Sequence, residues 1–373
     1  MNAKIYIEDY NCITPIGTDI ASNWKSLLDN KSEIKTHQIL DNHPGCYASI
    51  VDNDIINTEF SKITDRTDFT RFEKLLIIAI NPIIKSKSVA ENSLLVLSTT
   101  KGNISEISQK SELPESAHLY FSAQKIADFF NFKTKPIIVS NACVSGVMAV
   151  SIAKTLIETD KYDDAYIIAG DELTPFVVSG FNSFQALSEK PCKPYDSQRN
   201  GISIGEAAAA IYISRKESTF EILGSSSIND ANHISGPSRT GEGLVRSIQK
   251  AIEESDIQPS VIDYISAHGT ATIYNDEMEA IAFNRLNLQN TPVNSLKGYY
   301  GHCLGASGLL EIIVGLECSK NSVLLPTKNF ENIGVSQLIN VIAEKKNAEI
   351  KLFLKTASGF GGSNSAIIIK RTN

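Results

Sequence analysis

The stretch IIVSNACVSGVMAV, from Ile137 to Val150, passes from a short β-branched apolar run through a tight turn into a run of small apolar residues. This order predicts a buried strand, a turn and a helix. A second stretch, VNSLKGYYGHCLGASGLLEIIVGL from Val293 to Leu316, repeats the plan with a longer turn. Together they predict two similar α/β halves that pack around a shared helical layer, with equivalent turns meeting at the centre.

Other segments continue this alternation of strands and helices. Apolar, β-branched runs predict strands over residues 94–97, 136–139, 165–169, 207–213, 261–266 and 351–354. Helical patterns occupy residues 147–158, 243–254 and 306–318. A charged turn at residues 214–219 follows an apolar strand, so we place the boundary between the halves there. We expect an N-terminal half of residues 1–216 and a C-terminal half of residues 217–373.

Composition and net charge indicate the general class of protein. The chain has 373 residues, of which 42% are hydrophobic and 21% charged, which is ordinary for a globular protein with a large core. With 35 basic and 42 acidic residues, the formal net charge is −7. This acidic balance argues against a nucleic-acid binder that relies on phosphate neutralisation.

The cysteines and the N-terminus indicate the compartment. Six cysteines are scattered along the chain without CxxC pairs, which fits a reducing, intracellular location. The first residues, MNAKIYIEDYNCITPIG, lack the pattern of a signal peptide. No apolar run reaches the roughly 18 residues that would span a bilayer. We therefore expect a cytoplasmic protein without a membrane span.

Cys143 is the first candidate for chemistry, because it lies where an apolar strand turns into a small-residue helix. The positive end of that helix should lower the thiol pKa from about 8.5 and favour the reactive thiolate. The alternative is a buried structural cysteine, since free cysteine is among the most buried residue types. We expect the other five to be structural or incidental: Cys12, Cys46, Cys192, Cys303 and Cys318.

Two histidines are the next candidates. His268, in YISAHGTAT, closes an apolar strand at the sheet edge where ligands tend to bind, although a lone histidine there could simply cap a turn. His302, in NSLKGYYGHCLGASG, stands just before a small-residue helix, with Lys297 before it and Glu311 after it. The HExxH and paired CxxC patterns are absent, so we expect no zinc or other metal.

A glycine-flanked loop, SGFGGSN from Ser358 to Asn364, follows the strand expected at 351–354. Its glycines allow a close backbone approach, which could supply N–H donors to an oxyanion. It lacks the GxxxxGK[ST] pattern of a phosphate loop. A cysteine, two imidazoles, a lysine and such a loop are what thioester condensation requires, and no cofactor is needed.

The combination resembles an elongating β-ketoacyl-acyl carrier protein synthase of the Cys-His-His kind, in the thiolase superfamily. The resemblance covers nearly the whole chain and is carried by NACVSG, KPYDSQRNGISIGEAAAAIYI, AHGTATIYND, NSLKGYYGHCLGASG and SGFGGSN. It implies a thiolase-type, five-layered α/β/α/β/α fold built from two similar halves. The second histidine separates the chain from Cys-His-Asn initiating synthases. Biosynthetic thiolases carry a second catalytic cysteine near the C-terminus, where this chain has the GFGG loop.

The same resemblance implies roles for the catalytic residues. Cys143 would be the acyl nucleophile, and His268 and His302 would bind the malonyl carbonyl during decarboxylation. Lys297 and Glu311 match the lysine and glutamate that order the second histidine.

Further residues would support them. Phe360 matches the aromatic gate beside the cysteine, and its N–H, with that of Cys143, would form the oxyanion hole. Asp196 and Arg199 would make a structural ion pair.

The implied activity is that of an acyltransferase. It is a decarboxylating Claisen condensation of an enzyme-bound acyl thioester with malonyl-acyl carrier protein, giving a β-ketoacyl product in fatty-acid or polyketide elongation. Expected partners are acyl- and malonyl-loaded carrier protein and a second ketosynthase subunit, in a homodimer or a heterodimer.

Two other functions compete with this one. A chain-length-factor-like partner would shape the pocket of an active sister subunit, and a Cys-His hydrolase would release free acid. Departures at residues 32–85, in NACVSG and in Thr99-Thr-Lys-Gly-Asn103 also resemble variants in aryl polyene or dialkylresorcinol pigment pathways.

Overall fold

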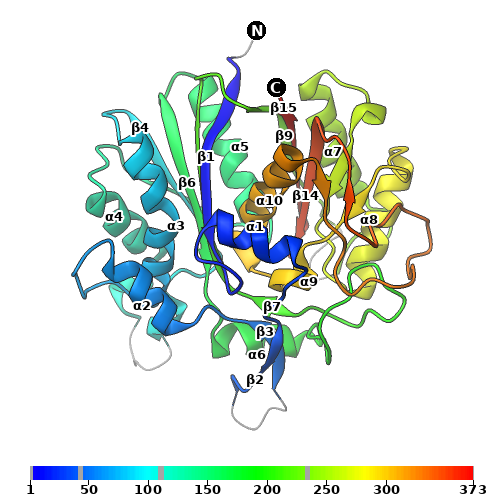
Figure 1. Cartoon of the computed structure of the whole chain (residues 1–373), viewed down its shortest axis with the longest axis horizontal. Coiled ribbons are helices and arrows are strands. Elements are labelled where there is room, and N and C mark those ends of the chain that lie inside the picture. The colour runs from blue at the N-terminus through cyan, green and yellow to red at the C-terminus, as the bar shows by residue number, and fades with distance from the viewer. Residues whose placement is uncertain (1–2, 41–44, 108–112, 232–235, 373) are drawn as a thin grey trace.

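The computed structural model describes residues 3–40, 45–107, 113–231 and 236–372 (Figure 1). Its main feature is a ten-stranded mixed sheet in the order β11-β10-β14-β15-β9-β1-β8-β6-β4-β5. The N-terminal five strands are β1 (Ile5–Ile13), β4 (Ser93–Ser98), β5 (Ile137–Val139), β6 (Asp164–Asp171) and β8 (Ala207–Ser214). The C-terminal five are β9 (Phe220–Asn229), β10 (Tyr264–Ser266), β11 (Val293–Asn294), β14 (Leu352–Gly359) and β15 (Ser363–Arg371).

The two sets of five strands have the same topology. From β1 outward, β8 and β6 pair antiparallel, and then β4 and β5 pair parallel. From β9 outward, β15 and β14 pair antiparallel, and then β10 and β11 pair parallel. A short antiparallel contact between β1 and β9 joins the two sets into one sheet. This duplication agrees with the two similar halves expected from the sequence.

Helices fall into three layers around this sheet, as Figure 1 shows. One outer face of the N-terminal strands packs on α3 (Arg71–Lys87) and α4 (Leu119–Phe129). One outer face of the C-terminal strands packs on α7 (Glu242–Ser255) and α8 (Ile273–Arg285). Between the halves lie α5 (Ser145–Glu158) and α10 (Ser307–Asn321), within a single large core. The five layers α/β/α/β/α are those implied by the family resemblance.

Shorter elements surround the layers. The helices are α1 (Ile20–Leu28), α2 (Asn53–Ser61), α6 (Pro175–Ser183) and α9 (Lys297–Tyr300), with 3₁₀ turns η1 (Ile104–Ile107), η2 (Glu115–Ala117), η3 (Pro259–Val261) and η4 (Leu304–Ala306). The small sheets comprise β2 (Lys35–His37), β3 (Cys46–Ser49) and β7 (Ile204–Gly205), and β12 (Val323–Leu324) with β13 (Lys346–Asn347). Within the described ranges, no helix is both long enough and apolar enough to cross a bilayer.

Most of the expected elements agree with the structure, but two differ. The strand expected over 261–266 begins only at Tyr264, because Pro259 opens the 3₁₀ turn η3 and Val261 is exposed. The strand expected over 351–354 continues to Gly359, since β14 pairs with β15 along its whole length. The boundary expected between residues 216 and 217 falls in the turn between β8 and β9. The division into two folding halves stays a prediction.

The two central helices cross where both sequences have glycine. A Cβ added to Gly146 of α5 would come within 2.6 Å of the Leu309 backbone nitrogen. A Cβ added to Gly308 of α10 would come within 2.9 Å of the Val147 backbone nitrogen. Because the colliding atoms are backbone, neither contact can be relieved by a side-chain rotation. The close crossing therefore requires glycine on both helices, and it sets the distance between the two halves.

This crossing predicts the effect of adding one methyl group. We expect Gly146→Ala to lower the free energy of unfolding by about 2 kcal/mol or more, because the backbones of α5 and α10 must separate. Gly180→Ala is the matched control, since Gly180 lies in α6 with no atom within 4 Å of the added Cβ. Urea unfolding followed by circular dichroism should show a lower midpoint for Gly146→Ala alone. Equal midpoints in the two variants would contradict the account of the crossing.

Candidate active site

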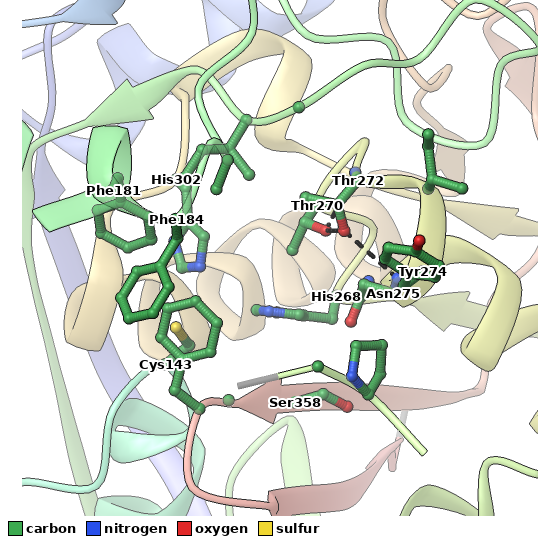
Figure 2. A pocket seen from close by; sticks show the side chains of 18 of the residues that line it. Cys143, Phe181, Phe184, His268, Thr270, Thr272, Tyr274, Asn275, His302 and Ser358 are labelled. Atoms are coloured by element: carbon green, nitrogen blue, oxygen red, sulfur yellow. Dashed lines mark hydrogen bonds between the residues drawn. The ribbon is translucent and has the colours of Figure 1, made fainter. Parts of the chain in front are cut away.

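Equivalent turns of the two halves deliver the first two candidate residues to one place. Cys143 lies in the turn between β5 and α5, and His302 lies in the longer turn between β11 and α10. These turns occupy the same position in the two sets of strands, so crossing α5 with α10 brings them together. His268 follows β10, and the GFGG loop joins β14 to β15. Cys143, His268, His302 and Phe360 line one cavity of about 360 Å³ (Figure 2).

The cysteine and the two imidazoles form a buried cluster. Their exposed fractions are 8% for Cys143 and 2% for each histidine. The Cys143 sulfur and one ring nitrogen from each histidine lie within 4.8 Å of one another. The ring centroids of His268 and His302 are 5.3 Å apart and nearly perpendicular. Figure 2 shows both imidazoles directed toward the cysteine.

Backbone geometry determines which nitrogen of His302 carries the proton. The Leu304 N–H donates to His302 Nδ1 at 3.0 Å, so Nδ1 must be an acceptor. Burial and the ammonium groups of Lys297, Lys101 and Lys355 lower the pKa of His302 well below its usual range. The ring is therefore neutral at neutral pH, with its proton on Nε2. His302 can donate a hydrogen bond from Nε2 but cannot accept a proton there.

A lysine gives His268 the same arrangement. Lys297 Nζ lies 3.3 Å from His268 Nδ1 and 2.8 Å from Glu311 Oε1, and it also donates to the His268 carbonyl oxygen. Three ammonium protons thus meet three acceptors, which makes Nδ1 an acceptor and leaves the proton on Nε2. The family resemblance implied that Lys297 and Glu311 order the second histidine, His302. That expectation is wrong, because the lysine contacts His268.

A second buried lysine was missed from the sequence. Lys355 is fully buried on β14, and its Nζ lies 2.6 Å from Glu311 Oε2. It also donates to the backbone carbonyls of Ser266 and Ala267 at 3.2 and 3.1 Å, next to His268. The signal was a lysine in the apolar run KLFLKTASG, because such a charge needs a buried partner. Glu311 therefore holds two ammonium groups behind the imidazoles.

The thiol itself behaves differently from the sequence-based expectation. Burial raises the pKa of Cys143 to about 11, although the charges of Lys297 and Lys101 oppose the rise. The expected lowering by the helix end is wrong in direction, because removing the thiolate from water outweighs the nearby positive charges. The residue before it, Ala142, has a φ of 45°, a strained conformation that turns the backbone sharply at this point. Cys143 is thus a protonated thiol in the resting site.

The same three residues have the donor types that Zn²⁺ prefers. A neutral imidazole that binds a metal through Nε2 must carry its proton on Nδ1. Both Nδ1 atoms face hydrogen-bond donors instead, the Leu304 N–H and the Lys297 ammonium. The arrangement therefore favours hydrogen-bond donation from both rings over coordination of a metal.

Aromatic rings surround the cavity mouth. Phe360 is 37% exposed, and its ring centroid lies 6.0 Å from that of Phe181 and 5.3 Å from that of Phe184. The Phe181 ring in turn lies 6.4 Å from His302. This row of rings connects solvent to the imidazoles beside Cys143. The predicted gate residue thus lies at the mouth, and its gating role stays a prediction.

A pair of acidic residues on α8 holds the turn after His268. Glu279 accepts the N–H groups of His268 and Gly269 at 2.8 and 2.7 Å. Asp276 accepts the Thr270 N–H at 2.9 Å, and burial raises the pKa of its carboxyl to about 7. Both acids stand in the segment that follows His268 in the sequence. Their spacing from the histidine was the available signal.

The expected ion pair between Asp196 and Arg199 is not formed. The Asp196 carboxylate accepts backbone N–H groups, among them that of Gln198 at 2.8 Å. Arg199 instead donates to the Asp196 backbone carbonyl and approaches the Asp276 carboxylate at 3.9 Å. Each side chain therefore stabilises loop backbone beside the site, and the two side chains do not pair with each other.

The remaining cysteines are free and buried: Cys12, Cys46, Cys192, Cys303 and Cys318. Only Cys143 among the six lines the cavity. This placement agrees with their expected structural role.

Solved structures share this fold. One chain of the complex of the ketosynthase ApeO with its chain length factor ApeC, from Xenorhabdus doucetiae, has a TM-score of 0.88 and 24% identity, covering 99% of this chain and 98% of that one. A beta-ketoacyl synthase from Burkholderia phymatum has a TM-score of 0.86 and 20% identity over the whole of both chains. The architecture is therefore that of the ketosynthases, as the sequence predicted.

Comparison of the sequence gives the family. The beta-ketoacyl synthase N-terminal domain matches residues 2–219, and its C-terminal domain matches residues 219–331. The chain belongs to the beta-ketoacyl synthase family. The 3-oxoacyl-[acyl-carrier-protein] synthase 2 of Rhizobium meliloti is 32% identical over 62% of this chain and 60% of that protein. The protein of the same name from Coxiella burnetii is 24% identical over 99% of this chain and 98% of that protein.

The raised thiol pKa predicts how Cys143 reacts with pH. We expect its alkylation by iodoacetamide to accelerate about tenfold per pH unit from pH 7 to 10 without a plateau, since only the thiolate reacts. Lys297→Met should slow alkylation at any fixed pH, because losing this positive charge raises the thiol pKa further. Intact-mass kinetics with peptide mapping measures both rates, and Cys143→Ala corrects for the other cysteines. A plateau below pH 9 would instead support a thiolate stabilised by the helix end.

Proposed function

We propose that this protein is a condensing enzyme that joins an acyl group held on Cys143 to malonyl-acyl carrier protein, with loss of carbon dioxide. The observation that carries the proposal is one buried cavity in which the Cys143 thiol faces two neutral imidazoles with their protons on Nε2. Membership of the beta-ketoacyl synthase family supports the same reaction class. Homologues named 3-oxoacyl-[acyl-carrier-protein] synthase support it further.

The first step is transfer of the acyl group. The Cys143 sulfur attacks the thioester carbonyl carbon of an acyl-loaded carrier protein, and the bond from that carbon to the carrier sulfur breaks. The proton of Cys143 passes to the departing carrier thiol. The N–H groups of Cys143 and Phe360 would donate hydrogen bonds to the negatively charged oxygen of the tetrahedral intermediate. Splitting the reaction at this covalent intermediate divides one difficult step into two.

The second step is decarboxylation of the malonyl group. The Nε2–H groups of His268 and His302 donate to the malonyl thioester oxygen. As the bond to the carboxylate carbon breaks, carbon dioxide leaves and the electron pair moves into an enolate whose negative oxygen both donors stabilise. Neutral rings suit this task, because they donate strongly without surrendering the proton to the enolate.

The final step forms the new carbon–carbon bond. The enolate carbon attacks the carbonyl carbon of the acyl group on Cys143, and the bond to sulfur breaks. The product is a β-ketoacyl group on the carrier protein, and the Cys143 thiolate recovers a proton from solvent. Aromatic side chains at the mouth, including Phe360, restrict water from the intermediates.

The two competing functions are less well supported. A Cys-His hydrolase needs a histidine nitrogen that accepts the thiol proton, but both imidazoles already carry their protons on Nε2. A chain-length-factor-like subunit has no need for the buried ion pairs of Glu311 with Lys297 and Lys355, which hold the site in order. The complete cluster therefore favours catalysis by this chain.

Carrier protein, loaded with an acyl or a malonyl group, is the proposed partner. We also propose a dimer, either with a second copy or with a related ketosynthase subunit. The structure of ApeO with its chain length factor illustrates the second arrangement for that protein. The cytoplasmic location stays a prediction, and the sequence did not decide between fatty-acid synthesis and a pigment or polyketide pathway.

Half-reactions test the proposal directly. Incubation with acyl-carrier proteins of several chain lengths should give an acyl adduct by intact mass, and Cys143→Ala should abolish it. His302→Ala should retain the adduct but lower carbon dioxide release from malonyl-carrier protein by about 100-fold, since one oxyanion donor is lost.

Other outcomes would overturn it. An acyl adduct with no chain length, or one that survives in Cys143→Ala, would contradict the role of the thiol. Free acid released without malonyl consumption would indicate the hydrolase. Unchanged product formation by Cys143→Ala in complex with a second synthase would indicate the partner subunit.

A further inference from the structure

Asp171 lies behind the site, at the end of β6, and was not singled out from the sequence. Its side chain is 2% exposed. The carboxylate accepts the hydroxyls of Thr99 and Thr100 at 3.0 and 2.9 Å, and the Thr100 N–H at 3.0 Å. It also accepts the Gly305 N–H at 2.7 Å. One buried carboxylate thus ties β6 and the loop after β4 to a turn of the other half of the chain.

Both backbone polar groups of Gly305, its N–H and its carbonyl oxygen, are bound by side chains of the N-terminal half. While Asp171 accepts its N–H, the Ser98 hydroxyl donates to its carbonyl oxygen at 3.2 Å. A Cβ at Gly305 would come within 2.8 Å of Asp171 Oδ2, so the fit requires glycine. These contacts fix the turn η4 immediately before α10.

The residue before Gly305 is strained. Leu304 has a φ of 52°, a left-handed conformation that residues with a branched, bulky side chain rarely adopt. Such a conformation persists only where the surroundings hold it. Its N–H donates to His302 Nδ1 at 3.0 Å, and the Ser307 hydroxyl lies 3.2 Å from the same nitrogen. The anchor at Gly305 therefore keeps Leu304 in the conformation that directs this N–H at the ring.

We propose that Asp171 is a positioning residue that sets the tautomer of His302. By anchoring the Gly305 peptide, it keeps the Leu304 N–H on Nδ1 and so keeps the His302 proton on Nε2, facing Cys143. The effect of Asp171 on the tautomer is inferred from these contacts alone. Its consequence for catalysis rests on the proposed function, in which Nε2–H stabilises the malonyl enolate.

If Asp171 acted only through its charge, its removal would change the reactivity of the Cys143 thiol. Its negative charge raises the pKa of Cys143, so removing it should make the thiol more reactive. A positioning role predicts that decarboxylation fails while acyl transfer to Cys143 continues. The two half-reactions therefore separate the explanations.

The experiment compares Asp171→Ala and Asp171→Asn with a matched control. Asp164→Asn is the control, because Asp164 is a buried acid at the opposite end of the same strand. In Asp171→Ala we expect carbon dioxide release from malonyl-carrier protein to fall about 10- to 100-fold, with acylation of Cys143 within about threefold of the unmodified protein. Asp171→Asn should be intermediate, since its amide oxygen can still accept the Gly305 N–H. Asp164→Asn should leave the ratio of the half-reactions unchanged.

NMR spectroscopy determines the tautomer of His302 without any substrate. In protein labelled with ¹⁵N-histidine, the chain has six histidines, and His302→Gln assigns the His302 signals. The unmodified protein should show an unprotonated Nδ1 and a protonated Nε2 for His302. Asp171→Ala should shift the proton toward Nδ1.

Several results would overturn the proposal. A His302 tautomer unchanged in Asp171→Ala would do so, and so would an equal fall in both half-reactions. If Asp171→Ala does not fold, an Asp171→Leu variant, which is similar in size but cannot accept the Gly305 N–H, would reject it by showing an unaltered tautomer and an unaltered half-reaction ratio. If the unmodified protein releases no carbon dioxide, the proposed function fails, while the NMR measurement still decides the role of Asp171.

Discussion

The close crossing of α5 and α10 at Gly146 and Gly308 is the constraint on which the rest of the structure depends. Each helix follows a turn at the same position of its own half, and each turn carries one reactive residue. When the helices meet backbone to backbone, Cys143 and His302 meet as well. A bulkier contact would separate the halves and the two residues together. Stability and catalysis therefore share one packing requirement, which explains why small residues dominate the start of both helices.

Burial of charged groups determines the chemistry of the site that this helix crossing creates. Glu311 lies between Lys297 and Lys355, so a carboxylate and two ammonium groups share a site from which water is excluded. The excess positive charge helps to keep His302 neutral. The same burial raises the pKa of the Cys143 thiol, so this site does not store a thiolate. Instead it presents hydrogen-bond donors arranged in advance for negative charge that develops only during reaction.

Much of this could be predicted from sequence. The strand-turn-helix pattern around Cys143 and its repeat around His302 are local features, and they predicted the duplicated fold and the residues that gather in the cavity. What could not be predicted depends on contacts between distant segments. The partner of Lys297 is His268 rather than His302 because β10, which precedes His268, pairs with β11, which precedes Lys297, and this pairing exists only in the folded chain. The anchor from Asp171 to Gly305 crosses between the halves; Gly305 lies in the NSLKGYYGHCLGASG motif, but nothing in the sequence around Asp171 marks it as the partner. The thiol pKa was misjudged because the pattern reveals a helix end but not the depth of burial.

The central claim is that the two Nε2–H groups act together on one oxygen beside Cys143. A crystal structure with a malonyl thioester analogue that cannot lose carbon dioxide tests it most directly. The account predicts that the thioester oxygen lies about 2.7–3.1 Å from Nε2 of both His268 and His302, with its reacting carbon facing the Cys143 sulfur. An analogue whose thioester oxygen contacts neither imidazole, or a ring turned so that Nδ1 faces the ligand, would contradict it.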